Sequence, residues 1–305
     1  MIERVCVIGG GSIGSLFAGH LAQVCDVSVL TRRADHAAAL NAEGLRISGR
    51  ADLHASITAS HDPAELAPFD LGIVATKANG LEEAARSLEG RFPEATMMTT
   101  LNGLGAEEVV LEHGAWPMIS AVTFMSGTRH SDTHVEYILD TETWMGPYGG
   151  LSFERVREAA ELMTRAGLKV EAMPDLRPAQ WSKLIFNATV NTVAALTGLP
   201  HDPHFAAEEQ PADLGHLVHA LVDEGKAVAA AAGITLHDDP WEMNVLATRR
   251  GSAHYPSMLE DVEARRRTEI ELITGSLVRE AERLGVAVPL HTTMYRLIKA
   301  KEASW

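Results

Sequence analysis

The first half of the chain alternates short apolar runs with stretches of helical pattern. The runs are four to six residues long and occupy residues 5–8, 26–30, 71–76, 96–101 and 118–123. Helical patterns follow several of them, at residues 15–24, 82–88 and 107–113. Short, mostly apolar runs are typical of parallel strands buried on both faces. The alternation therefore predicts βαβ units and a doubly wound parallel sheet.

A different pattern begins at residue 129 and continues to residue 146. Its segments HVEYILD and TETWMG have strand-like composition and predict antiparallel strands at an edge of the sheet. Residues 153–166 then have a helical pattern, and residues 168–172 predict a last strand.

Strand signals nearly vanish after Pro174 and Pro178. The later segments have helical composition, at residues 179–196, 213–232, 257–284 and 292–303. We therefore predict an α/β domain of the Rossmann type over residues 1–174. An all-helical domain over residues 175–305 would then serve substrate binding and dimerisation.

The first apolar run leads directly into the glycines of GGGSIG. Gly9, Gly11 and Gly14 have the GxGxxG spacing, and a helical pattern follows them. In this context the first glycine permits a tight turn, the second admits a pyrophosphate, and the third lets the helix pack on the strand. The backbone around Ser12 and Ile13 would then bind the pyrophosphate at the helix N-terminus. The alternative is an ordinary glycine-rich turn.

The second strand ends in Thr31-Arg32-Arg33, with no acidic residue. An NAD site usually places Asp or Glu here for the ribose 2′-hydroxyl, whereas arginine accommodates the 2′-phosphate of NADP. We therefore predict NADP(H) as the cofactor, with Arg32 the first candidate and Arg33 the second. The alternative is that both are surface arginines.

Composition limits the classes of partner. The formal net charge of −15 disfavours nucleic acid and anionic membranes as partners. No apolar stretch reaches the roughly 18 residues that a membrane span needs. The two cysteines, Cys6 and Cys25, do not make a disulfide framework. We therefore expect both cysteines to be free thiols in a reducing compartment, and the protein to be cytoplasmic.

Three polar residues repeat within an otherwise apolar helical segment, WSKLIFNATVN. Lys183, Asn187 and Asn191 are spaced i, i+4, i+8 and so lie on one helical face. Burying a lysine without partners is costly, so the triplet needs a reason. One reading is a proton donor flanked by amides that orient a substrate or the nicotinamide. The other is a satisfied polar stripe at a domain interface.

Further candidates come from three other segments. Pro256 precedes Ser257, which can cap a helix or reach a ligand, and Glu269 lies twelve residues further on. Lys77 and Asn102 each follow a predicted parallel strand, where ligands bind in this fold. The alternatives are a surface helix with charge pairs, a solvated lysine and a turn asparagine.

The histidines do not predict a metal site. His201 with His204, and His216 with His219, could be mistaken for ligand pairs, but no further ligand has a recognised spacing. We expect solvated or capping histidines and no metal.

Together these motifs resemble the ketopantoate reductase (2-dehydropantoate 2-reductase) family over essentially the whole chain. The resemblance implies NADPH-dependent reduction of ketopantoate to pantoate in pantothenate synthesis. It assigns catalysis to Lys183 and implies that Glu269 helps to hold the substrate. The same resemblance gives substrate contacts to Asn187, Asn191 and Ser257, with Lys77 and Asn102 lining the cleft. We also expect Lys77 and Asn102 to contact the cofactor.

The chemistry of such a site can be stated physically. Hydride transfer to a ketone leaves an alkoxide, so a proton donor or a positive charge must lie at that oxygen. Lys183 can supply both. Burial is expected to lower its pKa, and a nearby carboxylate such as Glu269 to raise it.

One position departs from the family. An asparagine that contacts substrate often lies three residues before the serine, and His254 stands there in this chain. The substrate could therefore be a different 2-oxo acid bound with the help of His254.

A rival of another class is an NADP(H)-sensing protein without turnover. The sequence leaves the formation of a homodimer open.

Overall fold

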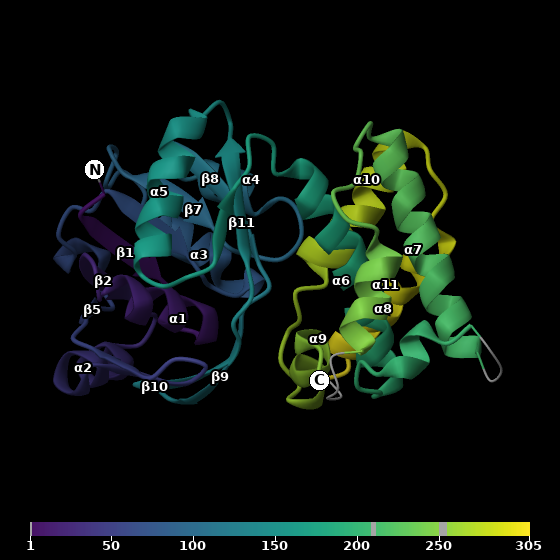
Figure 1. The fold of residues 1–305 in the computed structure, drawn as a ribbon, viewed down its shortest axis with the longest axis horizontal. Helices are drawn as coiled ribbons and strands as arrows, with labels where there is room; N and C mark the ends of the chain where they lie inside the picture. Colours follow the sequence, from purple (N-terminus) through teal and green to yellow (C-terminus); the bar gives the residue numbers. More distant parts are fainter. Residues whose placement is uncertain (1, 209–211, 250–254) are drawn as a thin grey trace. The chain divides into compact units, whose positions relative to one another are not determined.

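The computed structural model describes residues 2–208, 212–249 and 255–305. The chain divides into two compact units (Figure 1). The first comprises Met1–Leu101 and Ala106–Leu176, and the second comprises Asn102–Gly105 and Arg177–Trp305. The short segment Asn102–Gly105 thus belongs to the second unit although its sequence neighbours belong to the first.

The first unit is built on an eight-stranded sheet of order β12-β11-β8-β7-β6-β1-β2-β5. Its pairs are parallel except for β8 with β11, which is antiparallel. The strands are β1 (Arg4–Ile8), β2 (Asp26–Leu30), β5 (Thr58–Ser60), β6 (Leu71–Val74), β7 (Thr96–Thr99), β8 (Met118–Thr123), β11 (Thr143–Tyr148) and β12 (Val170–Ala172). This confirms the predicted doubly wound sheet.

The strand order reverses at β1, which lies between β2 and β6. Ile8 is in register with Leu30 on one side and with Val74 on the other. Ligands of such sheets bind beyond the carboxyl ends of the strands at this switch point. The glycine loop therefore begins at the expected place.

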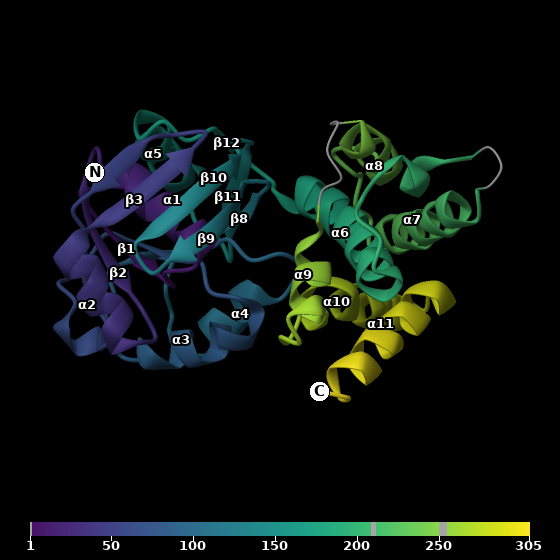
Figure 2. The ribbon, with the colours of Figure 1, turned by 90° about the horizontal axis from the view of Figure 1, so that it is seen from below.

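Helices cover both faces of this sheet (Figure 2). On one side lie α3 (Leu81–Ser87) and α4 (Ala106–Leu111), and on the other α1 (Ser12–Leu21) and α5 (Phe153–Arg165). The remaining helix, α2 (Ala34–Glu43), packs against β5. Buried side chains of β1 and α1, including Val5, Val7, Leu16 and Phe17, share one apolar core.

A second sheet, of order β4-β3-β10-β9, corrects the predicted antiparallel edge. Its strands are β3 (Leu45–Gly49), β4 (Leu53–Ala55), β9 (Ser126–Ser131) and β10 (His134–Leu139). The segment HVEYILD lies inside this sheet, where it pairs antiparallel with β9, as predicted, and in parallel with β3. Only β11 joins the main sheet, antiparallel to β8. Ile47 and Val135 are buried in the same core as Leu16 and Phe17, so this sheet covers the outer side of α1.

Among its described residues, the regular elements of the second unit are helices, as predicted. Its centre is α6, which packs against α7, α8, α9 and α11. The helices are α6 (Arg177–Thr197), α7 (Asp213–Ala231), α8 (Pro240–Thr248), α9 (Ser257–Glu263), α10 (Ser276–Leu284) and α11 (Pro289–Glu302). In the part of the chain that is described, no helix is both long and apolar enough to cross a membrane.

The segment of helical composition at residues 257–284 is divided into separate helices. After α9, Arg265 has a positive φ of 50°, which ends the helix. The guanidinium of Arg266 donates to the buried Asp261 at 3.0 Å, just after the end of α9. A short π-helix, Glu271–Gly275, then leads into α10.

Candidate functional site

The glycine loop has the geometry that a bound dinucleotide requires. Gly9 has a φ of 110°, and a Cβ on Gly14 would lie 2.0 Å from the Gly9 carbonyl oxygen. These two glycines therefore serve the turn and the packing of the helix on the strand. A Cβ on Gly11 would meet nothing within 4 Å, so space is open there at the start of the helix.

The N-terminus of α1 is free to bind an anion. Gly11 is the N-cap residue and no side chain caps the helix, so the first N–H groups, including those of Ser12 and Ile13, have no side-chain acceptor at the cap. The helix dipole adds positive potential at the same place. The residues present thus fit the pyrophosphate of a dinucleotide.

The two arginines that follow β2 differ in their environment. Arg33 forms ion pairs with Asp35, at 3.4 Å, and with Asp132. Arg32 is exposed and makes no hydrogen bond or ion pair with any other described residue. Arg32 is therefore the arginine whose charge is available to a ligand.

Sequence reasoning missed two side chains near the glycine loop. Arg129, on β9, donates to the Gly10 carbonyl oxygen at 3.4 Å and pairs with Asp132 at 3.0 Å. The carbonyl oxygen of Asp132 bonds the ring of His36, which lies against Gly10. Arg129 is 119 residues from Gly10 in sequence, so no local pattern indicates this contact.

In the second unit, α6 carries the predicted polar triplet. Lys183 is 5% exposed and Asn191 is 6% exposed, while Asn187 is partly buried. The side-chain oxygen of Asn191 accepts the Met258 N–H at the start of α9, at 3.4 Å. Ser257, the first residue of α9, is exposed and does not cap the helix.

A hydrogen-bonded network joins three segments of the second unit. The Asn102 amide donates to the Glu269 carboxylate at 3.1 Å, and the Asn187 amide donates to the Asn102 side-chain oxygen at 3.3 Å. Glu269 acts electrostatically on Lys183. The structure therefore brings four of the predicted site residues into one network.

The pKa of Lys183 responds to two opposing influences. Burial lowers the pKa of this ammonium group to about 8, and the Glu269 carboxylate raises it. Both directions confirm the sequence-based expectation. An ammonium group with this pKa can release its proton near neutral pH, as a general acid must.

Two other predicted residues fall outside this network. Lys77 follows β6, is exposed and belongs to the first unit. His254 lies outside the described residues.

Two of the histidines that could be mistaken for metal ligands are not simply solvated. His201 is buried and bonds the Asn244 side-chain oxygen at 2.9 Å, and His219 stacks on Trp241. Among the described residues, no group of three His, Cys, Asp or Glu side chains could hold a metal ion.

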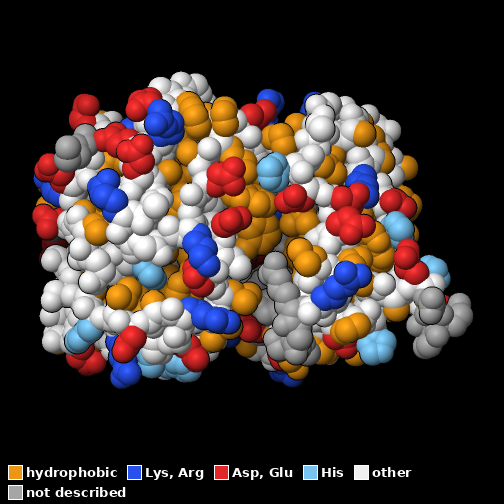
Figure 3. Space-filling model, in the orientation of Figure 1, with side chains coloured by type: hydrophobic (Ala, Val, Ile, Leu, Met, Phe, Trp, Pro, Cys, Tyr) orange, Lys and Arg blue, Asp and Glu red, His pale blue; other side chains and the backbone are white. Residues whose placement is uncertain are grey.

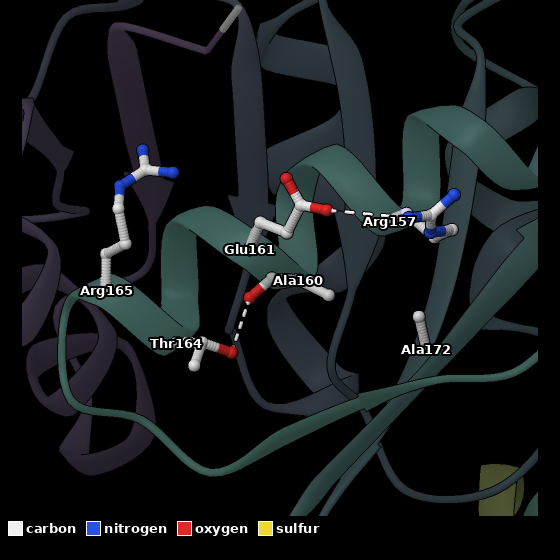
Figure 4. Close-up of a pocket in the computed structure, with 6 residues that line it drawn as sticks. All are labelled: Arg157, Ala160, Glu161, Thr164, Arg165 and Ala172. Carbon is white, nitrogen blue, oxygen red and sulfur yellow. Dashed lines mark hydrogen bonds and ion pairs between the residues drawn. The ribbon is translucent and has the colours of Figure 1, made fainter.

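A surface cavity of 460 Å³ lies elsewhere, on α5 and the edge strand β12. Figure 4 shows Glu161 directed towards Arg157 and the Thr164 hydroxyl bonded to the Ala160 carbonyl oxygen. Its polar groups are thus mostly engaged with one another, and none of the predicted site residues lines it.

Known protein families match both units of the chain. Residues 5–150 match the family "Ketopantoate reductase PanE/ApbA", and residues 175–302 match its C-terminal counterpart. The 2-dehydropantoate 2-reductase of Pyrococcus horikoshii is 29% identical over 300 residues, which are 98% of each chain.

Solved structures of relatives share the fold over the whole chain. A 2-dehydropantoate 2-reductase from Methylococcus capsulatus is 28% identical, with a TM-score of 0.84 and coverage of 99% of this chain and 97% of its own. A D-mandelate dehydrogenase with NADH and anilino(oxo)acetate superposes with a TM-score of 0.89 at 22% identity, covering 99% of each chain.

Proposed function

This chain belongs to the ketopantoate reductase family, and we propose that it reduces a 2-oxo acid to a 2-hydroxy acid with NADPH, with ketopantoate the first-choice substrate. The observation that carries this proposal is the buried Lys183 in a network with Glu269, Asn102 and Asn187. A protein that only senses NADP(H) needs the glycine loop but has no use for such a network.

In this proposal, Lys183 and Glu269 have different roles that follow from their charges. When bound, NADPH supplies the hydride. Lys183 donates the proton to the ketone oxygen, and its positive charge stabilises the negative charge that develops there. Glu269 keeps Lys183 protonated near neutral pH, because it raises a pKa that burial lowers.

The substrate carboxylate needs its own partners. Asn187, Asn191 and Ser257 are the proposed partners in the second unit, and Lys77 is the proposed cationic partner in the first. Asn191 already bonds the backbone at the start of α9, so its amide is held in a fixed orientation. An amide held in this way loses little entropy when it binds a ligand.

The preference for NADP(H) rests on Arg32. Its guanidinium is exposed at the end of β2 without a partner among the described residues, whereas Arg33 is held by two carboxylates. A planar guanidinium suits a phosphate dianion. The same position in an NAD enzyme usually carries an acid.

The decisive experiment measures NADPH oxidation by the purified protein with ketopantoate, and with NADH in parallel. We expect turnover that prefers NADPH, and a loss of about 100-fold or more in kcat for Lys183→Ala, the usual range for a lost acid catalyst. Lys226→Ala is the control, because Lys226 pairs with Asp239 at the surface of the same unit.

Two other outcomes would redirect the assignment. Turnover of another 2-oxo acid but not of ketopantoate would keep the chemistry and change the substrate, which the histidine at position 254 already suggests. Binding of NADPH without turnover of any 2-oxo acid would favour the sensing protein.

A further inference from the structure

The segment Asn102–Gly105 contacts the π-helix Glu271–Gly275 through its backbone. The Leu104 N–H donates to the Leu272 carbonyl oxygen at 2.9 Å. A Cβ on Gly103 would lie 1.8 Å from that same oxygen. A separation of this size is impossible for any side chain, so the approach requires glycine at position 103.

The π-helix makes the Leu272 carbonyl available for this contact. The Gly275 N–H bonds the Ile270 carbonyl oxygen at 2.8 Å, five residues back, as in a π turn. The Leu272 oxygen instead accepts the Ser276 hydroxyl, at 2.6 Å, and the Leu104 N–H. The same turn holds Glu269, whose carbonyl oxygen accepts the Leu272 N–H at 3.2 Å.

The contact therefore fixes both partners of one site hydrogen bond. Asn102 immediately precedes Gly103, and Glu269 lies three residues before Leu272. Gln180, one turn before Lys183 on α6, also donates to the Gly103 carbonyl oxygen, at 3.4 Å. The Glu269 carboxylate raises the pKa of Lys183.

We propose that Gly103 is a positioning residue of the active site, whose close approach to the Leu272 carbonyl holds the Asn102 amide on Glu269 and so fixes Glu269 relative to Lys183. Gly103 itself touches neither substrate nor cofactor in this account. Its effect on catalysis, though not its effect on the charge of Lys183, rests on the proposed function.

The chain contains a matched control two residues away. Gly105 has a φ of 97°, almost the same as the 98° of Gly103, so alanine imposes similar backbone strain at both positions. A Cβ on Gly105 would lie 3.9 Å from its nearest neighbour, an ordinary contact. Only Gly103→Ala therefore disturbs the approach to Leu272.

The test is an NMR titration of lysine labelled with ¹³C at Cε, in which Lys183 is one of six lysines. We expect Gly103→Ala to lower the pKa of Lys183, because Glu269 no longer supports its positive charge. It should also reduce kcat by about a hundredfold, as small misplacements of catalytic groups do. Gly105→Ala should leave the pKa of Lys183 unchanged.

A second variant tests the same proposal if Gly103→Ala does not fold. Asn102→Ala removes the amide without a collision, and it should move the pKa of Lys183 in the same direction. The proposal is overturned if Gly103→Ala matches Gly105→Ala, or if the pKa rises towards 10.5 because water enters the site. The titration needs no turnover, so it separates this proposal from a failure of the proposed function.

Discussion

The buried environment of Lys183 disfavours the positive charge of its side chain. Burial lowers its pKa from 10.5 to about 8, so the folded protein bears a free-energy cost for the ammonium form below pH 8. This cost disappears as pH rises from about 8 towards 10.5. Catalytic residues often destabilise the fold in this way.

We therefore predict that Lys183→Met is inactive but more stable at pH 7, by up to about 3 kcal/mol. Methionine has a similar length, carries no charge and suits the apolar neighbours on α6. Urea unfolding of both proteins at pH 7 and at pH 10 tests this, and the difference should shrink at the higher pH. A variant less stable than the wild type at both pH values would contradict the prediction.

Arg32 and Arg33 give a second contrast between adjacent residues. Loss of a charge-assisted bond to phosphate costs about 1.5–3 kcal/mol, roughly a tenfold to hundredfold change in Kd. We predict that Arg32→Ala weakens the binding of NADPH by this factor and leaves the binding of NADH nearly unchanged. Arg33→Ala is the control, because its guanidinium is already paired with Asp132. Fluorescence titration gives both constants, and equal losses for the two cofactors would contradict the role of Arg32.

The sequence predicted some site residues and missed others for a clear reason. Helical spacing is local, so it placed Lys183, Asn187 and Asn191 together on α6. The bond between Asn102 and Glu269 joins residues 167 apart, and no spacing indicates it. Asn102 was a candidate because it follows a predicted strand, and the resemblance to a family gave Glu269 its role, but only the fold shows that Asn102 lies between Asn187 and Glu269.

At the scale of elements, the turn from β1 into α1 gives each glycine a separate task. Gly14 lets α1 pack on the loop, whereas Gly11 faces space that the protein leaves open. We therefore expect a substitution at position 14 to disturb the fold, and one at position 11 to affect the bound cofactor.

We predict that Gly11→Ala folds with a stability within about 1 kcal/mol of the wild type, because alanine is only a poorer N-cap. It should nevertheless weaken NADPH binding, because its methyl group enters the space expected for the pyrophosphate. Gly14→Ala should lower the thermal midpoint, since its Cβ would meet the Gly9 carbonyl oxygen. Thermal unfolding and cofactor titration of both variants separate the two effects. Normal NADPH affinity in Gly11→Ala would place the pyrophosphate elsewhere.

Three of the strands that sequence reasoning missed share a physical cause. The strands β3, β4 and β5 have three to five residues, too few for a clear periodic pattern. The break after α9 depends on a positive φ at Arg265, which composition does not indicate. Helix propensity predicts a helix over residues 257–284. The buried pair of Asp261 with Arg266 and the π turn interrupt that helix.

At the scale of the whole molecule, the chain passes between its two units at residues 101–102, 105–106 and 176–177. The first unit contains the glycine loop and Arg32, and the second contains the network of Lys183. On the face drawn in Figure 3, Lys and Arg side chains are interspersed with Asp and Glu. With a net charge of −15, we expect the molecule to attract the two anionic ligands of the proposed reaction through a few local cations.

This division predicts that the two ligands protect different segments from hydrogen exchange. NADPH at 100 times its Kd should stabilise the folded protein by about 2.7 kcal/mol, with slowed exchange in β1, α1 and the end of β2. Pantoate, added to the protein saturated with NADPH, should extend protection to α6. Because Asn102 and Lys183 belong to the second unit, the second step should spare the glycine loop. Protection of α6 by NADPH alone, equal to that with both ligands, would show that the cofactor by itself completes the site.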